Sequence, residues 1–166
     1  MLKLNYKKLL IKKNKIPITC LTAYSKPIAN ILDGKVDLIL VGDSLGTTLF
    51  GMQNTRGVTI EMMKNHGKTV VQNTKYSMTI IDMPYNTYRN KSEALKNARD
   101  ILAFTKADFI KIETDKKNLN IVEHLTKNKI KVVSHIGVTP QKFSNFSKIK
   151  SVGKNIKDSN NLLNLA

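Results

Sequence analysis

Short runs of apolar residues alternate with longer amphipathic segments along the chain. The clearest run is Leu38–Val41, four apolar residues of which two are β-branched, and it predicts a short strand that is buried on both faces. Similar runs predict four more strands, at residues 18–22, 76–81, 109–112 and 131–134. The segments between these runs predict helices, at residues 1–15, 27–32, 59–73, 92–102 and 119–125, with a last one starting at Leu162.

Capping residues mark several of these helix boundaries. Pro27 suits a first helical turn, and Gly34 can end the same helix. Thr59 is expected to cap the helix that follows it, with Glu61 placed favourably in the first turn, and Ser92 is expected to cap the next helix. Residues 47–58 are expected to form a loop.

Strand and helix alternate in steps of about 25–35 residues, which implies parallel strands joined by right-handed crossovers. Residues 1–166 are therefore expected to form a single α/β domain. The pattern fits an open doubly wound sheet and part of a (β/α)8 barrel equally well, and periodicity alone does not choose between them.

Composition narrows the classes of function. No apolar run approaches the ~20 residues of a membrane helix. Cys20 is the only cysteine, so an internal disulfide is excluded and a reducing cytoplasm is the expected location. The formal charge is +16, but only three of the basic residues are arginines and the lysines are scattered. Proteins that recognise nucleic-acid bases and phosphates usually use clustered arginines, so we expect no specific nucleic-acid function.

The candidate chemistry lies where strands end. Asp43, Asp82 and Glu113 each follow a predicted buried strand, and parallel strands bring such ends to one rim. Three converging carboxylates repel one another unless a cation lies among them, and oxygen ligands favour Mg²⁺ or a similar hard ion. Lys111 alternates with two isoleucines and shares a face with Glu113, so its charge needs an anion, either Glu113 or a substrate carboxylate. A purely structural Lys–Glu pair is the alternative.

Other polar residues give weaker signals. Ser44 follows Asp43 and suits a hydrogen bond to substrate better than nucleophilic attack, because no histidine base is placed for it. His135 either lines the rim or bonds to backbone in a turn. His66 and His124 lie in predicted helices and are expected to be structural or at the surface.

Several motifs occur together in an order that resembles the ketopantoate hydroxymethyltransferase family. They are Leu21-Thr22-Ala23-Tyr24, Leu40-Val41-Gly42-Asp43-Ser44-Leu45-Gly46, Asp82-Met83-Pro84, Lys111-Ile112-Glu113 and His135-Ile136-Gly137-Val138-Thr139-Pro140-Gln141. The resemblance implies a (β/α)8 barrel of the phosphoenolpyruvate/pyruvate superfamily, here with about its first five βα units. It also implies a cytoplasmic homo-oligomer, commonly a decamer, in pantothenate biosynthesis.

The same resemblance implies the chemistry and the role of each rim residue. A hydroxymethyl group would pass from 5,10-methylenetetrahydrofolate to 3-methyl-2-oxobutanoate through a Mg²⁺-stabilised enolate. Asp43, Asp82 and Glu113 would hold Mg²⁺, and the substrate would be contacted by Asp43, Ser44, Asp82 and Lys111.

The chain also departs from the family pattern. Ser25 stands where the family usually has Asp, and Thr114-Asp115 replace the usual glycines after Glu113. A barrel of this class takes ~250 residues, so we expect a truncated barrel, and no residue matches the glutamate that takes the proton in the family. Two alternatives therefore stay open: a carbon–carbon lyase of the same superfamily, and a non-catalytic remnant that binds without turnover.

Overall fold

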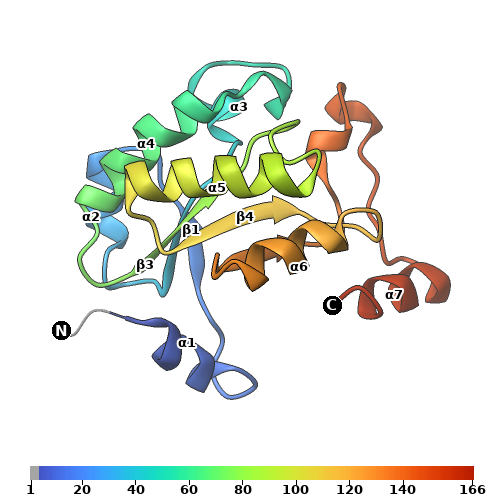
Figure 1. Cartoon of the computed structure of the whole chain (residues 1–166), viewed down its shortest axis with the longest axis horizontal. Coiled ribbons are helices and arrows are strands. Elements are labelled where there is room, and N and C mark those ends of the chain that lie inside the picture. The colour runs from blue at the N-terminus through green and yellow to red at the C-terminus, as the bar shows by residue number, and fades with distance from the viewer. Residues whose placement is uncertain (1–3) are drawn as a thin grey trace.

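The computed structural model describes residues 4–166, which form a five-stranded parallel sheet with helices between successive strands (Figure 1). The first half contains α1 (Tyr6–Lys12), β1 (Cys20–Thr22), α2 (Lys26–Leu32), β2 (Leu38–Val41), α3 (Leu45–Leu49), the 3-10 turn η1 (Thr55–Gly57) and α4 (Ile60–Gln72). The second half contains β3 (Met78–Asp82), α5 (Lys91–Thr105), β4 (Phe109–Glu113), α6 (Leu119–Lys127), β5 (Val132–His135), η2 (Pro140–Lys142), η3 (Phe146–Lys148) and α7 (Ile156–Leu163). The helix expected at residues 1–15 is shorter than that, and Met1–Lys3 lie outside the described residues.

The strand order decides between the two topologies that the sequence left open. The strands follow one another as β1-β2-β3-β4-β5, and every neighbouring pair is parallel. A doubly wound sheet reverses its order at a switch point, whereas this sheet does not. The successive helices α2, α4, α5 and α6 also pack against one another in sequence, in one layer. The topology is therefore that of the first five units of a (β/α)8 barrel.

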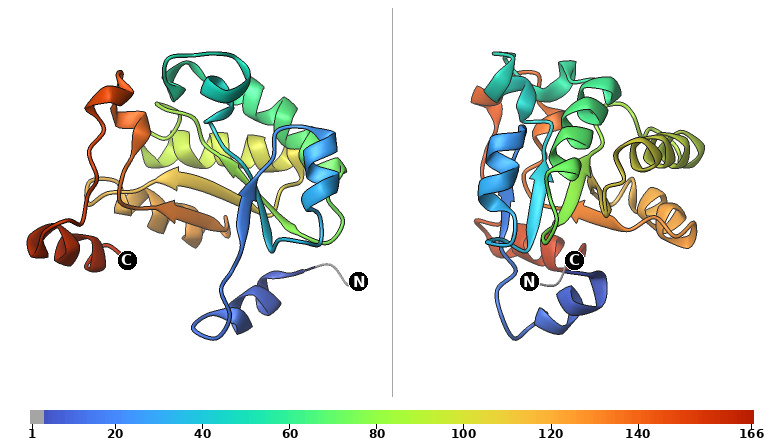
Figure 2. Two further views of the ribbon diagram at one scale, coloured as in Figure 1. Left: turned by 180° about the vertical axis from the view of Figure 1, so that it is seen from behind. Right: turned by 90° about the vertical axis from the view of Figure 1, so that its left-hand side faces the viewer.

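The two faces of the sheet bury different sets of apolar side chains. One face packs under the helices, and its strand residues include Ile39, Val41, Ile81, Ile110 and Ile112. The opposite face carries Leu38, Leu40, Met78, Ile80 and Phe109, which pack with Leu4 and with Leu9 of α1. Figure 2 shows α1 beneath the sheet, apart from the layer of α4, α5 and α6. Helix α1 thus covers the lower part of the face that the other helices leave open.

Two local features differ from the sequence prediction: the segment after β2 and the N-terminal cap of α5. The turn after β2 leads directly into the short helix α3 instead of a loop. Gly46 in this helix is buried, and the packing there requires glycine, because a Cβ would lie 2.6 Å from the side chain of Val58. Asn90, not Ser92, caps α5: its side chain accepts from the backbone N–H of Glu93 at 2.9 Å, so Ser92 lies inside the first turn.

The structure also corrects two predicted element boundaries, the start of α7 and the end of β5, and confirms one predicted helix cap. Helix α7 begins at Ile156, six residues before the expected start at Leu162, because the Asn155 side chain accepts from the backbone N–H of Asp158 at 2.9 Å. His135 is the last residue of β5 and not part of the turn. Thr59 does cap α4, as expected, by accepting from the backbone N–H of Met62.

Candidate active site at the carboxyl ends of the strands

The three carboxylates predicted from the sequence do meet at one rim of the sheet. Asp82 and Glu113 are the last residues of β3 and β4, and Asp43 lies two residues beyond the end of β2. Their exposed fractions are only 8% for Asp43, 3% for Asp82 and 7% for Glu113. A cavity of about 230 Å³ opens between them, and its polar lining comprises Asp43, Ser44, Thr47, Thr55, Asp82, Lys111, Glu113 and His135.

Lys111 pairs with a carboxylate that the sequence argument did not name. Its Nζ lies 2.5 Å from Asp82 Oδ1, whereas the sequence offered Glu113 or a substrate carboxylate as its partner. The reason lies in the register: Lys111 is directly opposite Asp82 on the neighbouring strand. Glu113, by contrast, is two residues farther along the same strand, about 6.6 Å away in an extended chain. Asp82 Oδ2 also accepts from the backbone N–H of Asp43 at 3.1 Å, so Asp82 joins three strand ends.

Gln141 organises the other two carboxylates, and the sequence argument gave it no role. Its backbone N–H donates to Glu113 Oε1 at 3.1 Å, and its side-chain Nε2 donates to Asp43 Oδ2 at 2.7 Å. The Tyr88 hydroxyl donates to Gln141 Oε1 at 2.5 Å. The only signal in the sequence was its place in the Thr139-Pro140-Gln141 motif, because nothing there shows that η2 folds back over the rim.

Burial shifts the pKa values of all three carboxyl groups upward, and repulsion by neighbouring carboxylates adds to the shift for Asp43 and Glu113. Burial raises the pKa of Asp43, and the Asp82 charge adds to the effect. Burial also raises the pKa of Asp82, although the Lys111 ammonium opposes it. For Glu113, burial together with the charges of Asp43 and Asp82 raises the pKa to about 7. The three carboxyl groups of the rim are therefore harder to ionise together unless a further positive charge lies among them.

Ser44 and the histidines occupy distinct positions. The Ser44 Oγ lies 2.6 Å from the Tyr24 hydroxyl and lines the cavity. His66 is structural, as expected: its Nδ1 lies 2.8 Å from the backbone oxygen of Tyr24. His124 lies in the last turn of α6, away from the rim cavity. His135 faces the cavity, and burial together with the Lys111 charge lowers the pKa of its imidazole.

The donor set fits a hard divalent cation in its chemistry. All three acidic side chains offer oxygen, and Glu113 Oε2 is buried without a hydrogen-bond partner among residues 4–166. Within that same part of the chain, no three acidic, histidine or cysteine side chains already converge on one metal position. Lys111 supplies positive charge to Asp82 in this arrangement. The assignment of Asp43, Asp82 and Glu113 to a metal thus stays a prediction.

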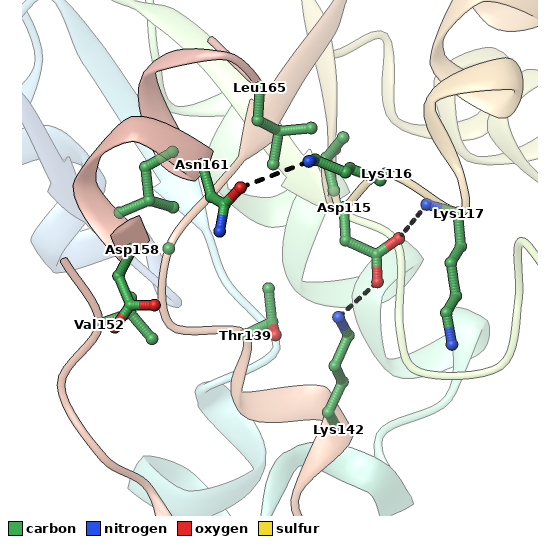
Figure 3. Close-up of a pocket in the computed structure, with 12 residues that line it drawn as sticks. Asp115, Lys116, Lys117, Thr139, Lys142, Val152, Asp158, Asn161 and Leu165 are labelled. Carbon is green, nitrogen blue, oxygen red and sulfur yellow. Dashed lines mark hydrogen bonds and ion pairs between the residues drawn. The ribbon is translucent and has the colours of Figure 1, made fainter. Parts of the chain in front are cut away.

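A second cavity, of about 410 Å³, lies beside the rim between the β4–α6 loop and α7 (Figure 3). Asp115, which together with Thr114 departs from the family pattern, lines this cavity. The Lys142 Nζ lies 2.6 Å from Asp115 Oδ2, and the backbone N–H of Lys117 donates to Asp115 Oδ1 at 2.7 Å. Asp115 therefore ties the β4–α6 loop to η2, where glycine has no side chain to do so.

Comparison with known proteins gives consistent results. The family model described as ketopantoate hydroxymethyltransferase matches residues 3–166. A 3-methyl-2-oxobutanoate hydroxymethyltransferase from Pelagibacter ubique is 51% identical over 147 residues, covering 89% of this chain and 56% of that protein. One from Rhizobium etli is 44% identical, covering 82% of this chain and 50% of that protein. The chain thus spans about half the length of the curated relatives it matches.

A solved structure is similar in fold. A 2,3-dimethylmalate lyase, a member of the PEP mutase/isocitrate lyase superfamily, superposes with a TM-score of 0.56 at 13% identity. The match covers 82% of this chain and 52% of that one. At this level of identity the likeness shows the fold alone, and it confirms the barrel-type arrangement of the strands.

Proposed function

The chain belongs to the ketopantoate hydroxymethyltransferase family, and from that membership we propose that its rim cavity binds a 2-oxo acid and a divalent cation for hydroxymethyl transfer. The proposed substrate is 3-methyl-2-oxobutanoate, and the proposed one-carbon donor is 5,10-methylenetetrahydrofolate. Assembly into a homo-oligomer and a cytoplasmic location belong to the same proposal and rest on family membership. No helix among residues 4–166 is both long enough and apolar enough to cross a membrane.

The observation that carries the proposal is one partly buried lysine among three buried carboxylates in a small cavity. A cavity of about 230 Å³ suits a small acid better than a drug-sized ligand, for which 300–1,000 Å³ is usual. Lys111 is the cation available to a substrate carboxylate, because its ammonium lies at the rim and its side chain keeps 18% exposure. The hydroxyl of Ser44, which lies 2.6 Å from the Tyr24 hydroxyl, lines the same cavity and offers a hydrogen bond.

In this proposal Asp43, Asp82 and Glu113 would hold Mg²⁺. When bound there, Mg²⁺ supplies Lewis acidity that makes the protons next to the substrate carbonyl easier to remove. Lys111 would turn from Asp82 toward the substrate and add positive charge where negative charge develops. Ser44 would orient the acid, and the surrounding apolar strands would limit the access of water.

A binding experiment tests the assignment of these residues. Isothermal titration of the protein with 3-methyl-2-oxobutanoate, with and without Mg²⁺, should show Mg²⁺-dependent binding. We expect Asp43→Ala and Asp82→Ala to abolish it, and Lys111→Met to weaken binding of the acid more than binding of Mg²⁺. Asp100→Ala, at a solvent-exposed acid of α5, is the matched control and should bind normally. Unchanged binding in both rim variants would reject the site.

A second experiment isolates proton transfer. The resemblance assigns the family's proton-accepting glutamate to none of residues 1–166, and a positioned general base contributes about 10²–10⁴-fold to rate. We therefore expect slow, Mg²⁺-dependent hydrogen–deuterium exchange at C3 of 3-methyl-2-oxobutanoate, followed by NMR. Brisk exchange would show that another group of this chain acts as the base. Binding without any exchange would favour the non-catalytic alternative.

A further inference from the structure

The side chain of Gln141 is a buried amide whose polar atoms all have partners. It is 4% exposed, and its Nε2 donates to Asp43 Oδ2 at 2.7 Å and to the backbone oxygen of Met83 at 3.0 Å. Its Oε1 accepts from the Tyr88 hydroxyl at 2.5 Å. An amide with both donors and its acceptor satisfied in a buried place is held rigidly, because any departure leaves a polar atom unpaired.

Only one of the two amide orientations is compatible with these neighbours. Turning the amide over would place Oε1 against the Asp43 carboxylate and the Met83 carbonyl, so that acceptor would face acceptor. The Tyr88 hydroxyl can donate or accept, and in the observed orientation it donates to Oε1. The Asp43 carboxylate and the Met83 carbonyl therefore specify the direction in which Gln141 donates, and Tyr88 completes the arrangement by holding Oε1.

Gln141 holds one oxygen of each of two acids and leaves the other available. Asp43 is held through Oδ2 by the amide, and Glu113 is held through Oε1 by the backbone N–H of the same residue. The second oxygen of Glu113, Oε2, is buried with no hydrogen-bond partner among residues 4–166. A buried acceptor of this kind calls for a ligand, and the cavity lies next to it.

Resting on the function proposed above, we propose that Tyr88 and Gln141 form a positioning pair that fixes the Asp43 and Glu113 carboxylates with their remaining oxygens available to a divalent cation. Neither residue touches the cation. Tyr88 holds the amide oxygen in place, and the amide and backbone N–H of Gln141 hold the two acids. The ends of β2, β3 and β4 are thereby joined, because Gln141 also donates to the backbone oxygen of Met83. Groups that orient metal ligands in this way are worth about 10–100-fold in metal affinity.

The test is Mn²⁺ binding, measured by electron paramagnetic resonance and by calorimetry, well below the thermal midpoint of each variant. Gln141→Met keeps the length of the side chain but cannot donate, and we expect it to weaken Mn²⁺ about 10–100-fold. Tyr88→Phe removes only the hydroxyl, and we expect a smaller loss in the same direction. Gln53→Met, at an exposed glutamine, and Tyr76→Phe, at a tyrosine 37% exposed, are the matched controls and should bind as the parent does.

The possible outcomes separate this inference from the proposed function. If the parent binds Mn²⁺ and both Tyr88→Phe and Gln141→Met bind it more weakly, the positioning pair is supported. If both variants bind Mn²⁺ as tightly as the parent, even with lowered thermal midpoints, the two residues have a merely structural role and the positioning pair is overturned. If Gln141→Met does not fold, Tyr88→Phe alone decides. A parent protein that binds no Mn²⁺ would overturn both the pair and the proposed metal site.

Discussion

The ion pair between Lys111 and Asp82 makes a quantitative prediction for Lys111→Met. The two atoms lie 2.5 Å apart, and the side chains of Lys111 and Asp82 keep 18% and 4% exposure. Removing one member of a buried pair costs about 3–5 kcal/mol, because the other charge stays buried without compensation. Since Lys111 keeps some solvent contact, we expect the lower end, about 3 kcal/mol of unfolding free energy at pH 8.

The same variant should show a distinctive dependence on pH. Burial already raises the pKa of Asp82 above 3.8 against the opposing Lys111 charge, and without that charge the pKa rises further. A carboxyl whose pKa is raised by folding stabilises the native state while protonated, and this contribution is lost as pH rises through the raised pKa. The penalty of Lys111→Met should therefore be smallest near pH 4. It should grow by up to about 1.4 kcal/mol per pH unit above that.

Urea unfolding followed by circular dichroism, at pH 5 and pH 8, measures both effects. The set comprises the parent, Lys111→Met, Asp82→Asn and the double variant. We expect the double variant to lose less than the sum of the single losses, by about 0.5–3 kcal/mol, as for residues in direct contact. Lys127→Met is the control, because its partner Glu123 is exposed and such pairs contribute at most about 1 kcal/mol. Additive losses, or a penalty that does not change with pH, would refute the reasoning.

Three further predictions concern single residues. The parent should lose about 3 kcal/mol of unfolding free energy between pH 4.5 and pH 7, because folding raises the pKa of Glu113 to about 7. Glu113→Gln should not show this loss. Thermal midpoints of variant and parent across that pH range would show the difference, and parallel curves would contradict it. Gly67→Ala should cost about 1–3 kcal/mol, since the new Cβ would lie 2.7 Å from Ile81 Cδ1, and an unchanged urea midpoint would mean that the packing yields. Asn90→Ala should cost about 1 kcal/mol and Ser92→Ala close to nothing in the same assay, and the reverse order would restore Ser92 as the cap of α5.

The sequence predicts the strands well because a buried parallel strand needs apolar residues at most of its positions. Leu38–Val41 and Phe109–Ile112 lie in strands, and the acids that follow such runs reach the same rim, as expected. Periodicity did not fix the order of the strands, because it is the same in a barrel and in an open sheet. The family resemblance implied the barrel, and the sequential strand order confirms it. That residues 1–166 form one domain stays a prediction.

The hydrogen-bond and ion-pair partners of the site residues were harder to predict than the positions of those residues at the strand ends. The pairing of Lys111 with Asp82 depends on register between two strands, which no local pattern encodes. Gln141 reaches Asp43 across 98 positions of sequence, through a turn that folds back over the rim. The misplaced cap of α5 has a local cause: Asn90 and Ser92 are both good caps, and only the backbone geometry shows which one is used.

The sequential order of the strands also has a consequence for how the chain is made. Each strand pairs with the one synthesised just before it, so each βα unit finds its surface already formed as it leaves the ribosome. At about 5–20 residues per second, one unit is added every few seconds. Helix α1 is the exception: Leu9 is made among the first residues, yet it packs against Met78, Ile80 and Phe109. The earliest helix therefore cannot complete its packing until the fourth strand has been translated.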